Sequence, residues 1–180
     1  MNKKNLIAGS CGILLSLSLA PFALADHDGD HGGQLRASLS GLQEVPTLST
    51  AGHGTFGMKV AKDGSSFDYT LTFSELEGAV SQSHIHLGQQ AITGGIMIWL
   101  CQGTSVAPAT AGTVPNCPVP GGTVTGTITS ANVIGPAAQG VDAGQFAEVL
   151  TAIKKGFAYA NVHSSKYPGG EIRGQIKGDD

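Results

Sequence analysis

The chain has 180 residues, with ten basic and thirteen acidic side chains, a formal net charge of −3 and 41% hydrophobic residues. This length suits one domain with a core of its own. The acidic excess argues against nucleic acid and against an anionic membrane as partners, because both select clustered lysine and arginine.

The first 25 residues predict a cleaved signal peptide. Lys3 and Lys4 precede an apolar run from Leu6 to Ala20, and Ala23-Leu24-Ala25 forms a small-x-small site just before Asp26. The apolar run is shorter than the ~20 residues of a membrane-spanning helix. We therefore expect a periplasmic or secreted protein that is cleaved after Ala25 and has no membrane span.

A polar, glycine-rich tail is predicted for residues 26–33. The segment "DHDGDHGG" has no apolar anchor, so we expect it to be flexible and solvated. After cleavage His27 would be the second residue behind a free amine, an arrangement able to chelate Cu(II). The tail therefore has two possible interpretations: it collects copper and passes it on, or it is only a solvated segment.

The remaining residues, 34–180, predict a single β-rich domain. Apolar and polar residues mostly alternate with period two, and turn residues separate the runs. The expected strands are 34–41, two runs within 54–73 that join at Lys62-Asp63-Gly64, and 79–87, 95–101, 122–129, 157–162 and 171–177. Only Ala143 to Lys155 has helical spacing, through Phe146, Val149, Leu150 and Ile153. The predicted fold is an all-β, antiparallel, Greek-key-like β-sandwich of about eight strands with one short helix at about 143–155.

Two cysteines remain after Cys11 is removed with the signal. Cys101 and Cys117 flank a segment rich in Gly, Pro, Ala and Thr that suits a long surface loop. In an oxidising compartment we expect them to form a disulfide, worth roughly 3 kcal/mol for a loop of about 15 residues. The alternative is two free thiols.

Three histidines are candidate metal ligands. On a strand, His84 and His86 of "SQSHIHLGQQ" point to one face while Ile85 points to the other. His163 of "FAYANVHSS" shares a face with Asn161 and can approach the pair if the two strands are neighbours. Three neutral imidazoles favour copper or zinc, whereas calcium and magnesium prefer oxygen. The alternative is that these are strand histidines without a common role.

Three longer stretches resemble a known family. In order and spacing, "SGLQEVPTLSTAGHGTF", "HIHLGQQAITGGIMIWL" and "GFAYANVHSSKYPGGEIRGQI" resemble the CHRD domain of chordin and of many secreted bacterial proteins. The resemblance runs from about Arg36 to Ile176. It implies an extracellular β-rich domain but gives no activity by itself.

The histidine pattern also resembles the copper site of the copper/zinc superoxide dismutases. Those enzymes have an H-x-H pair followed closely by glycine and a later histidine in a "VH" context, as His84, His86, Gly88 and His163 are arranged here. The zinc half has no counterpart, because between His86 and His163 there is no histidine. The resemblance therefore implies copper without zinc. His53 in "TAGHGTF" is the first candidate for a fourth ligand, and a plain exposed histidine is the alternative.

An arginine follows the last histidine closely. In the dismutases an arginine beside the copper attracts superoxide, so the resemblance makes Arg173 of "PGGEIRGQI" the candidate catalytic residue. The alternative is a structural ion pair with Glu171 or Glu44. Glu44 could instead hold a turn or orient a histidine.

Two classes of function remain. The first is a redox enzyme in which copper consumes superoxide, a small anionic substrate. The second is a non-enzymatic module that stores copper, binds an extracellular protein or forms a homo-oligomer. The sequence has no phosphate-binding loop, no G-x-S-x-G and no C-x-x-C, so hydrolase and nucleotide-binding functions have no support.

Overall fold

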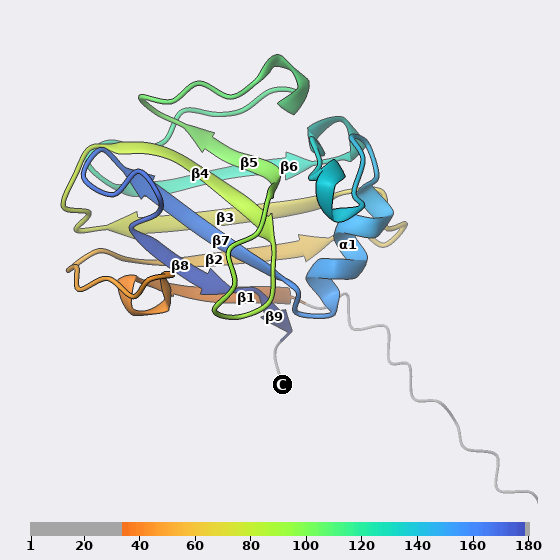
Figure 1. Ribbon diagram of the computed structural model, residues 1–180. Helices are drawn as coiled ribbons and strands as arrows, with labels where there is room; N and C mark the ends of the chain where they lie inside the picture. Colours follow the sequence, from red (N-terminus) through yellow and green to blue (C-terminus); the bar gives the residue numbers. More distant parts are fainter. Residues whose placement is uncertain (1–33, 179–180) are drawn as a thin grey trace, which may run out of the picture.

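The computed structural model describes residues 34–178, so the predicted signal peptide and histidine-containing tail lie outside the described residues. The described chain is an antiparallel β-structure with one α-helix, which confirms the expected fold class (Figure 1). The strands are β1 (Gln34–Ser40), β2 (His53–Val60), β3 (Phe67–Ser74), β4 (Val80–Leu87), β5 (Ile96–Gln102), β6 (Gly122–Ile128), β7 (Ala158–Ser164), β8 (Ile172–Gln175) and β9 (Lys177–Gly178), and the helix is α1 (Phe146–Lys154). Within this part of the chain, no helix has the length and apolar character needed to cross a membrane.

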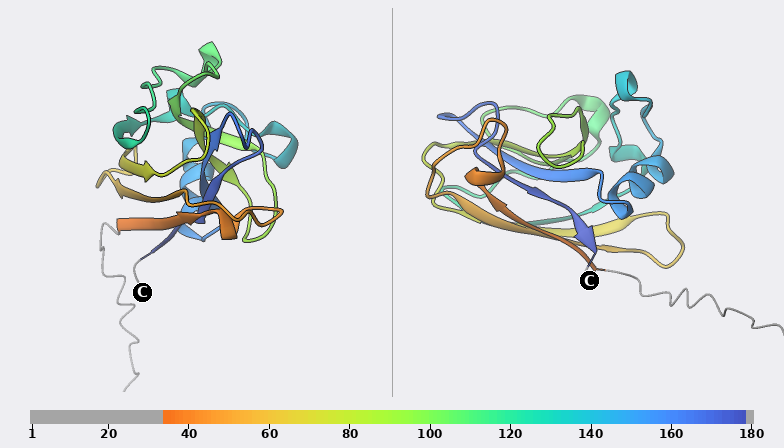
Figure 2. Two further views of the ribbon diagram at one scale, coloured as in Figure 1. Left: turned by 90° about the vertical axis from the view of Figure 1, so that its left-hand side faces the viewer. Right: turned by 60° about the horizontal axis from the view of Figure 1, so that its bottom comes forward.

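All nine strands belong to one sheet. Their order is β5-β4-β7-β8-β1-β2-β3-β6, and β9 pairs with β1. The sheet curls over so that β5 and β6, at the two ends of this order, approach each other and the domain is nearly barrel-shaped (Figures 1 and 2). β7 therefore lies in the middle of one half of the sheet, between β4 and β8.

Two kinds of strand build the core. In β1, β2 and β3 burial alternates with the sequence, so one face packs inward and the other is largely exposed. In β7 all seven residues are buried. Its core face carries Ala158, Ala160 and Val162, and its opposite face carries Tyr159, Asn161 and His163. A buried polar face of this kind must be covered by other segments.

The helix α1 covers one end of the curled sheet (Figure 1). Its apolar stripe is buried, and Phe146 stacks on Phe67 of β3 with 5.9 Å between ring centroids. The helix begins three residues later than expected, because Gly144 has φ +84 and the chain is still in a turn there.

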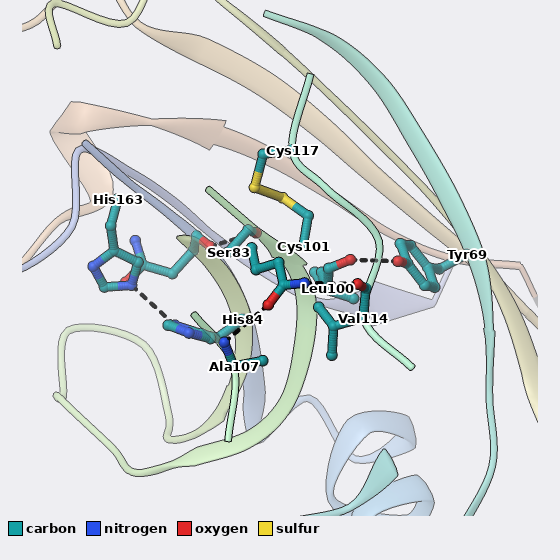
Figure 3. The surroundings of a disulfide bond; sticks show 11 residues. Tyr69, Ser83, His84, Leu100, Cys101, Ala107, Val114, Cys117 and His163 are labelled. Atoms are coloured by element: carbon teal, nitrogen blue, oxygen red, sulfur yellow. Dashed lines mark hydrogen bonds between the residues drawn. A yellow bond between two sulfur atoms is a disulfide. The ribbon is translucent and has the colours of Figure 1, made fainter. Parts of the chain in front are cut away.

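Cys101 and Cys117 form the predicted disulfide, with 5.0 Å between their Cα atoms (Figure 3). The bond joins the end of β5 to the far end of the following loop. Two backbone hydrogen bonds lie beside it, from Gln102 N to Pro115 O and from Cys117 N to Gln102 O. The loop is therefore fixed along the end of β5.

Candidate metal centre

The pairing of β4 with β7 brings three histidines together on the outer face of the sheet. The register places His84 opposite Asn161 and His86 opposite Tyr159, with His163 one step further along β7. One ligand nitrogen of each of His84, His86 and His163 lies within 4.8 Å of the others. The closest pair is His84 Nδ1 and His163 Nε2, 3.2 Å apart (Figure 3). We call these three residues the histidine trio.

The histidine trio is buried and uncharged. Its members are 0%, 7% and 6% exposed in chain order. Burial, and then the neighbouring imidazoles, lowers the pKa of His84 to about 2. Burial is also the main cause that lowers the pKa of His86 to about 4 and that of His163 below its usual range. Neutral imidazoles keep a lone pair for a metal at physiological pH.

Backbone carbonyls orient two members of the trio. His86 Nδ1 donates to Gly94 O at 2.9 Å, and His163 Nδ1 donates to Pro168 O at 3.0 Å. A carbonyl can only accept, so each Nδ1 carries the proton and each Nε2 keeps its lone pair. The Nε2 atoms of His84 and His86 are buried and have no hydrogen-bond partner among the described residues. Buried nitrogens with free lone pairs and imidazoles held by backbone carbonyls are features of metal ligands, and His86 has both, so the trio fits a metal that prefers nitrogen.

Aromatic rings enclose the trio. His84 meets Trp99 of β5 edge-on, with ring centroids 4.3 Å apart, and His86 stacks in parallel on Tyr159 at 4.8 Å. Arg173 lies 3.4 Å from the centroid of the Tyr159 ring. Because β7 runs between β4 and β8, His86 and Arg173 approach Tyr159 from opposite sides. The phenol ring therefore separates the guanidinium from the trio.

Arg173 holds the loop between β4 and β5. It is 3% exposed, and its Nη2 donates to Gln89 O at 3.1 Å and to Ile92 O at 2.9 Å. The same loop supplies the Gly94 carbonyl that orients His86, and Gly94 N donates to the Tyr159 hydroxyl at 3.1 Å. Sequence reasoning singled out Arg173 but not this loop, because backbone carbonyls leave no signature in the residue pattern.

The two acidic residues suggested as partners of Arg173 have other partners. Arg173 forms no ion pair with a described carboxylate. Glu171 is buried and accepts from Thr50 Oγ1 at 2.8 Å. Glu44 is 8% exposed, and its Oε1 accepts from Asn161 Nδ2 at 2.6 Å. Burial raises the pKa of Glu44 to about 7, against the opposing effects of the Asn161 hydrogen bond and the Arg173 charge.

The structure does not bring His53 to the trio. Its side chain is 59% exposed, its Nε2 is 3.0 Å from Ser74 Oγ, and its Nδ1 donates to Ala51 O at 3.1 Å. The physical reason is the strand order, since β8 and β1 lie between β7 and the strand β2 that carries His53. A fourth ligand from this position is therefore not part of the cluster.

Comparison with known families gives one match. The model of the CHRD domain matches residues 35–176, which is nearly the whole of the described domain. No curated protein and no solved structure matches the chain.

Proposed function

The chain belongs to the CHRD domain family, and on that premise we propose that it is an exported protein that binds copper through His84, His86 and His163. The observation that carries this proposal is the buried trio of neutral imidazoles with two orphaned Nε2 atoms. Export is supported by the disulfide, which is a feature of oxidising compartments.

The donor set favours copper over other common ions. Imidazole nitrogens suit copper and zinc, and Cu(II) stands highest in the affinity order of the divalent metals. When bound, copper would supply one-electron chemistry between Cu(II) and Cu(I). The residues of the chain hold the nitrogens neutral, fix their direction through Gly94 O and Pro168 O, and keep bulk water away from the site.

Copper binding can be tested on a form of the chain that begins at residue 33, so that His27 and His31 do not contribute. We expect one copper ion per chain, and we expect the His84→Ala/His86→Ala double variant to lose it. The matched control is His53→Ala, which removes an exposed imidazole outside the trio. Equal copper in the double variant, or loss of copper in the control, would place the ion elsewhere.

Superoxide dismutation is a second candidate function. Three protein nitrogens leave a coordination position for a small ligand, and the charge of Arg173 reaches His86 across the Tyr159 ring, where it helps to lower the pKa of this histidine. A copper-loaded enzyme should consume superoxide at a rate that falls with added salt, because ions screen attraction over about 8 to 10 Å. If the copper-loaded domain consumes superoxide no faster than the copper-free protein, the remaining function is copper storage or protein interaction.

A further inference from the structure

A small cavity beside Arg173 is lined by a basic and an acidic side chain that do not form an ion pair. It has a volume of about 140 Å³, and Arg173 and Glu44 both line it. The remaining polar wall comes from Gln43, Thr47, Gln90 and Gln175. Arg173 of β8 lies opposite Asn161 of β7, and Glu44 bonds to the Asn161 side chain, so the cavity lies on the same outer face as the histidine trio.

Both side chains are largely buried, and they do not pair with each other. Arg173 is 3% exposed and uses only its Nη2 in hydrogen bonds, so Nε and Nη1 have no protein acceptor among the described residues. Glu44 is 8% exposed, accepts from Asn161 Nδ2 and from the backbone N–H of Val45, and forms no ion pair with Arg173. Burial raises the pKa of Glu44 to about 7, so part of this carboxyl is protonated at neutral pH, and a cation bound beside it would stabilise the carboxylate. Buried charges are costly unless they are paired. The arrangement therefore suits a molecule that satisfies both groups at once.

The chemistry of the two groups defines that molecule. Because Nη2 is held by the loop carbonyls, Arg173 offers a carboxylate a single charge-assisted hydrogen bond from Nη1 or Nε, and a carboxylate in turn matches an ammonium group. The amide and hydroxyl groups of the wall can bond to a polar backbone but supply no further charge. At ~30 Å³ per water, the space equals roughly four or five water molecules, which limits the ligand to a small molecule.

We propose that this cavity binds a free α-amino acid with a short side chain, with its carboxylate on Arg173 and its ammonium group on Glu44. The proposal concerns a site separate from the histidine trio and does not rest on copper binding.

The test uses the metal-free protein and three probes. L-alanine carries both charged groups, whereas acetate carries only the carboxylate and methylammonium only the cation. In calorimetric titrations we expect saturable binding of one L-alanine per chain, at least about tenfold tighter than either half-ligand. No saturable binding of L-alanine would show that the cavity holds water alone. Acetate that binds as tightly as L-alanine would show a simple anion site, and either result overturns the proposal.

A pair of matched variants assigns the site. Glu44→Gln keeps the shape of the side chain and removes its charge, so L-alanine should bind about tenfold more weakly while acetate should bind no more weakly than before. Glu148→Gln makes the same change on the exposed face of α1 and should alter neither. Unchanged L-alanine affinity in Glu44→Gln would place the ligand elsewhere. The comparison of the three probes on the unaltered chain decides the proposal even if Glu44→Gln does not fold.

Discussion

Lowering the pH from 7 to 5 should leave the copper affinity of the domain nearly unchanged. An ordinary histidine with a pKa of ~6.5 is almost fully protonated at pH 5, and displacing its proton costs about 2 kcal/mol. Three such ligands would lose about 6 kcal/mol, or roughly four powers of ten in affinity.

The buried trio behaves differently. The pKa values of His84 and His86, about 2 and about 4, lie below pH 5, and the pKa of His163 is lowered in the same direction. Folded protein therefore presents mostly neutral imidazoles at pH 5, and protons compete weakly with the metal. We expect the affinity to fall by about tenfold at most.

The fluorescence of Trp99 offers the assay. It is the single tryptophan of the chain, and its ring centroid lies 4.3 Å from that of His84, so bound Cu(II) should quench it. Titrations at pH 7 and pH 5 should be made on the form that begins at residue 33, with circular dichroism to verify that it is folded at both. A loss of about a thousandfold or more between these pH values would show that the trio titrates like exposed histidine and would refute the argument from burial.

Three further predictions test other parts of the structure. The folded pKa of Glu44 is raised from 4.5 to about 7, so its contribution to the free energy of unfolding is fully present below pH 4.5 and falls by about 3 kcal/mol as the pH rises to 7. Urea titrations at several pH values should find this loss absent in Glu44→Gln, and an equal dependence of stability on pH in the two proteins would contradict the buried carboxyl. Mass analysis without reductant should find Cys101 joined to Cys117, and reduction should lower the free energy of unfolding by about 3 kcal/mol; free thiols in exported protein would count against the pairing. A Cβ on Gly94 would lie 1.7 Å from a backbone oxygen of β4, whereas one on Gly57 would meet nothing within 4 Å; Gly94→Ala should therefore weaken copper binding at least about tenfold by displacing the carbonyl that orients the trio, while Gly57→Ala should bind as the parent does, and equal affinities would show that this carbonyl is dispensable.

The strands could be predicted because apolar and polar residues alternate along them, and buried and exposed side chains alternate in the same way in the structure. β1 was expected at 34–41 and runs from Gln34 to Ser40, and the hairpin expected at Lys62-Asp63-Gly64 joins β2 to β3. The spacing of His84 and His86 also fixed a common face for them, since a strand has a period of two. Local pattern was sufficient for each of these features.

Strand order could not be obtained in that way. His163 reaches the trio only because β7 pairs with β4, and His53 stays away because two strands intervene. Arg173 was expected to steer an anion from its place in a motif, but cross-strand neighbours bury it against Tyr159 and the loop carbonyls. These roles depend on contacts between distant segments and on backbone atoms, and neither is encoded by residue type at one position.

The loop closed by the disulfide also determines whether β5 can recruit another chain. β5 ends the strand order, and its sequence "IMIWLCQ" is strongly apolar, so a free outer edge would be a template for pairing between molecules. That edge is met at Met97 by the N–H of Ile134 and at Gln102 by Pro115 and Cys117. Reduction of the disulfide releases the segment around Pro115 and Cys117 from this edge. The reduced protein should therefore be lost from solution by concentration-dependent aggregation through β5, under conditions in which the oxidised protein stays in solution.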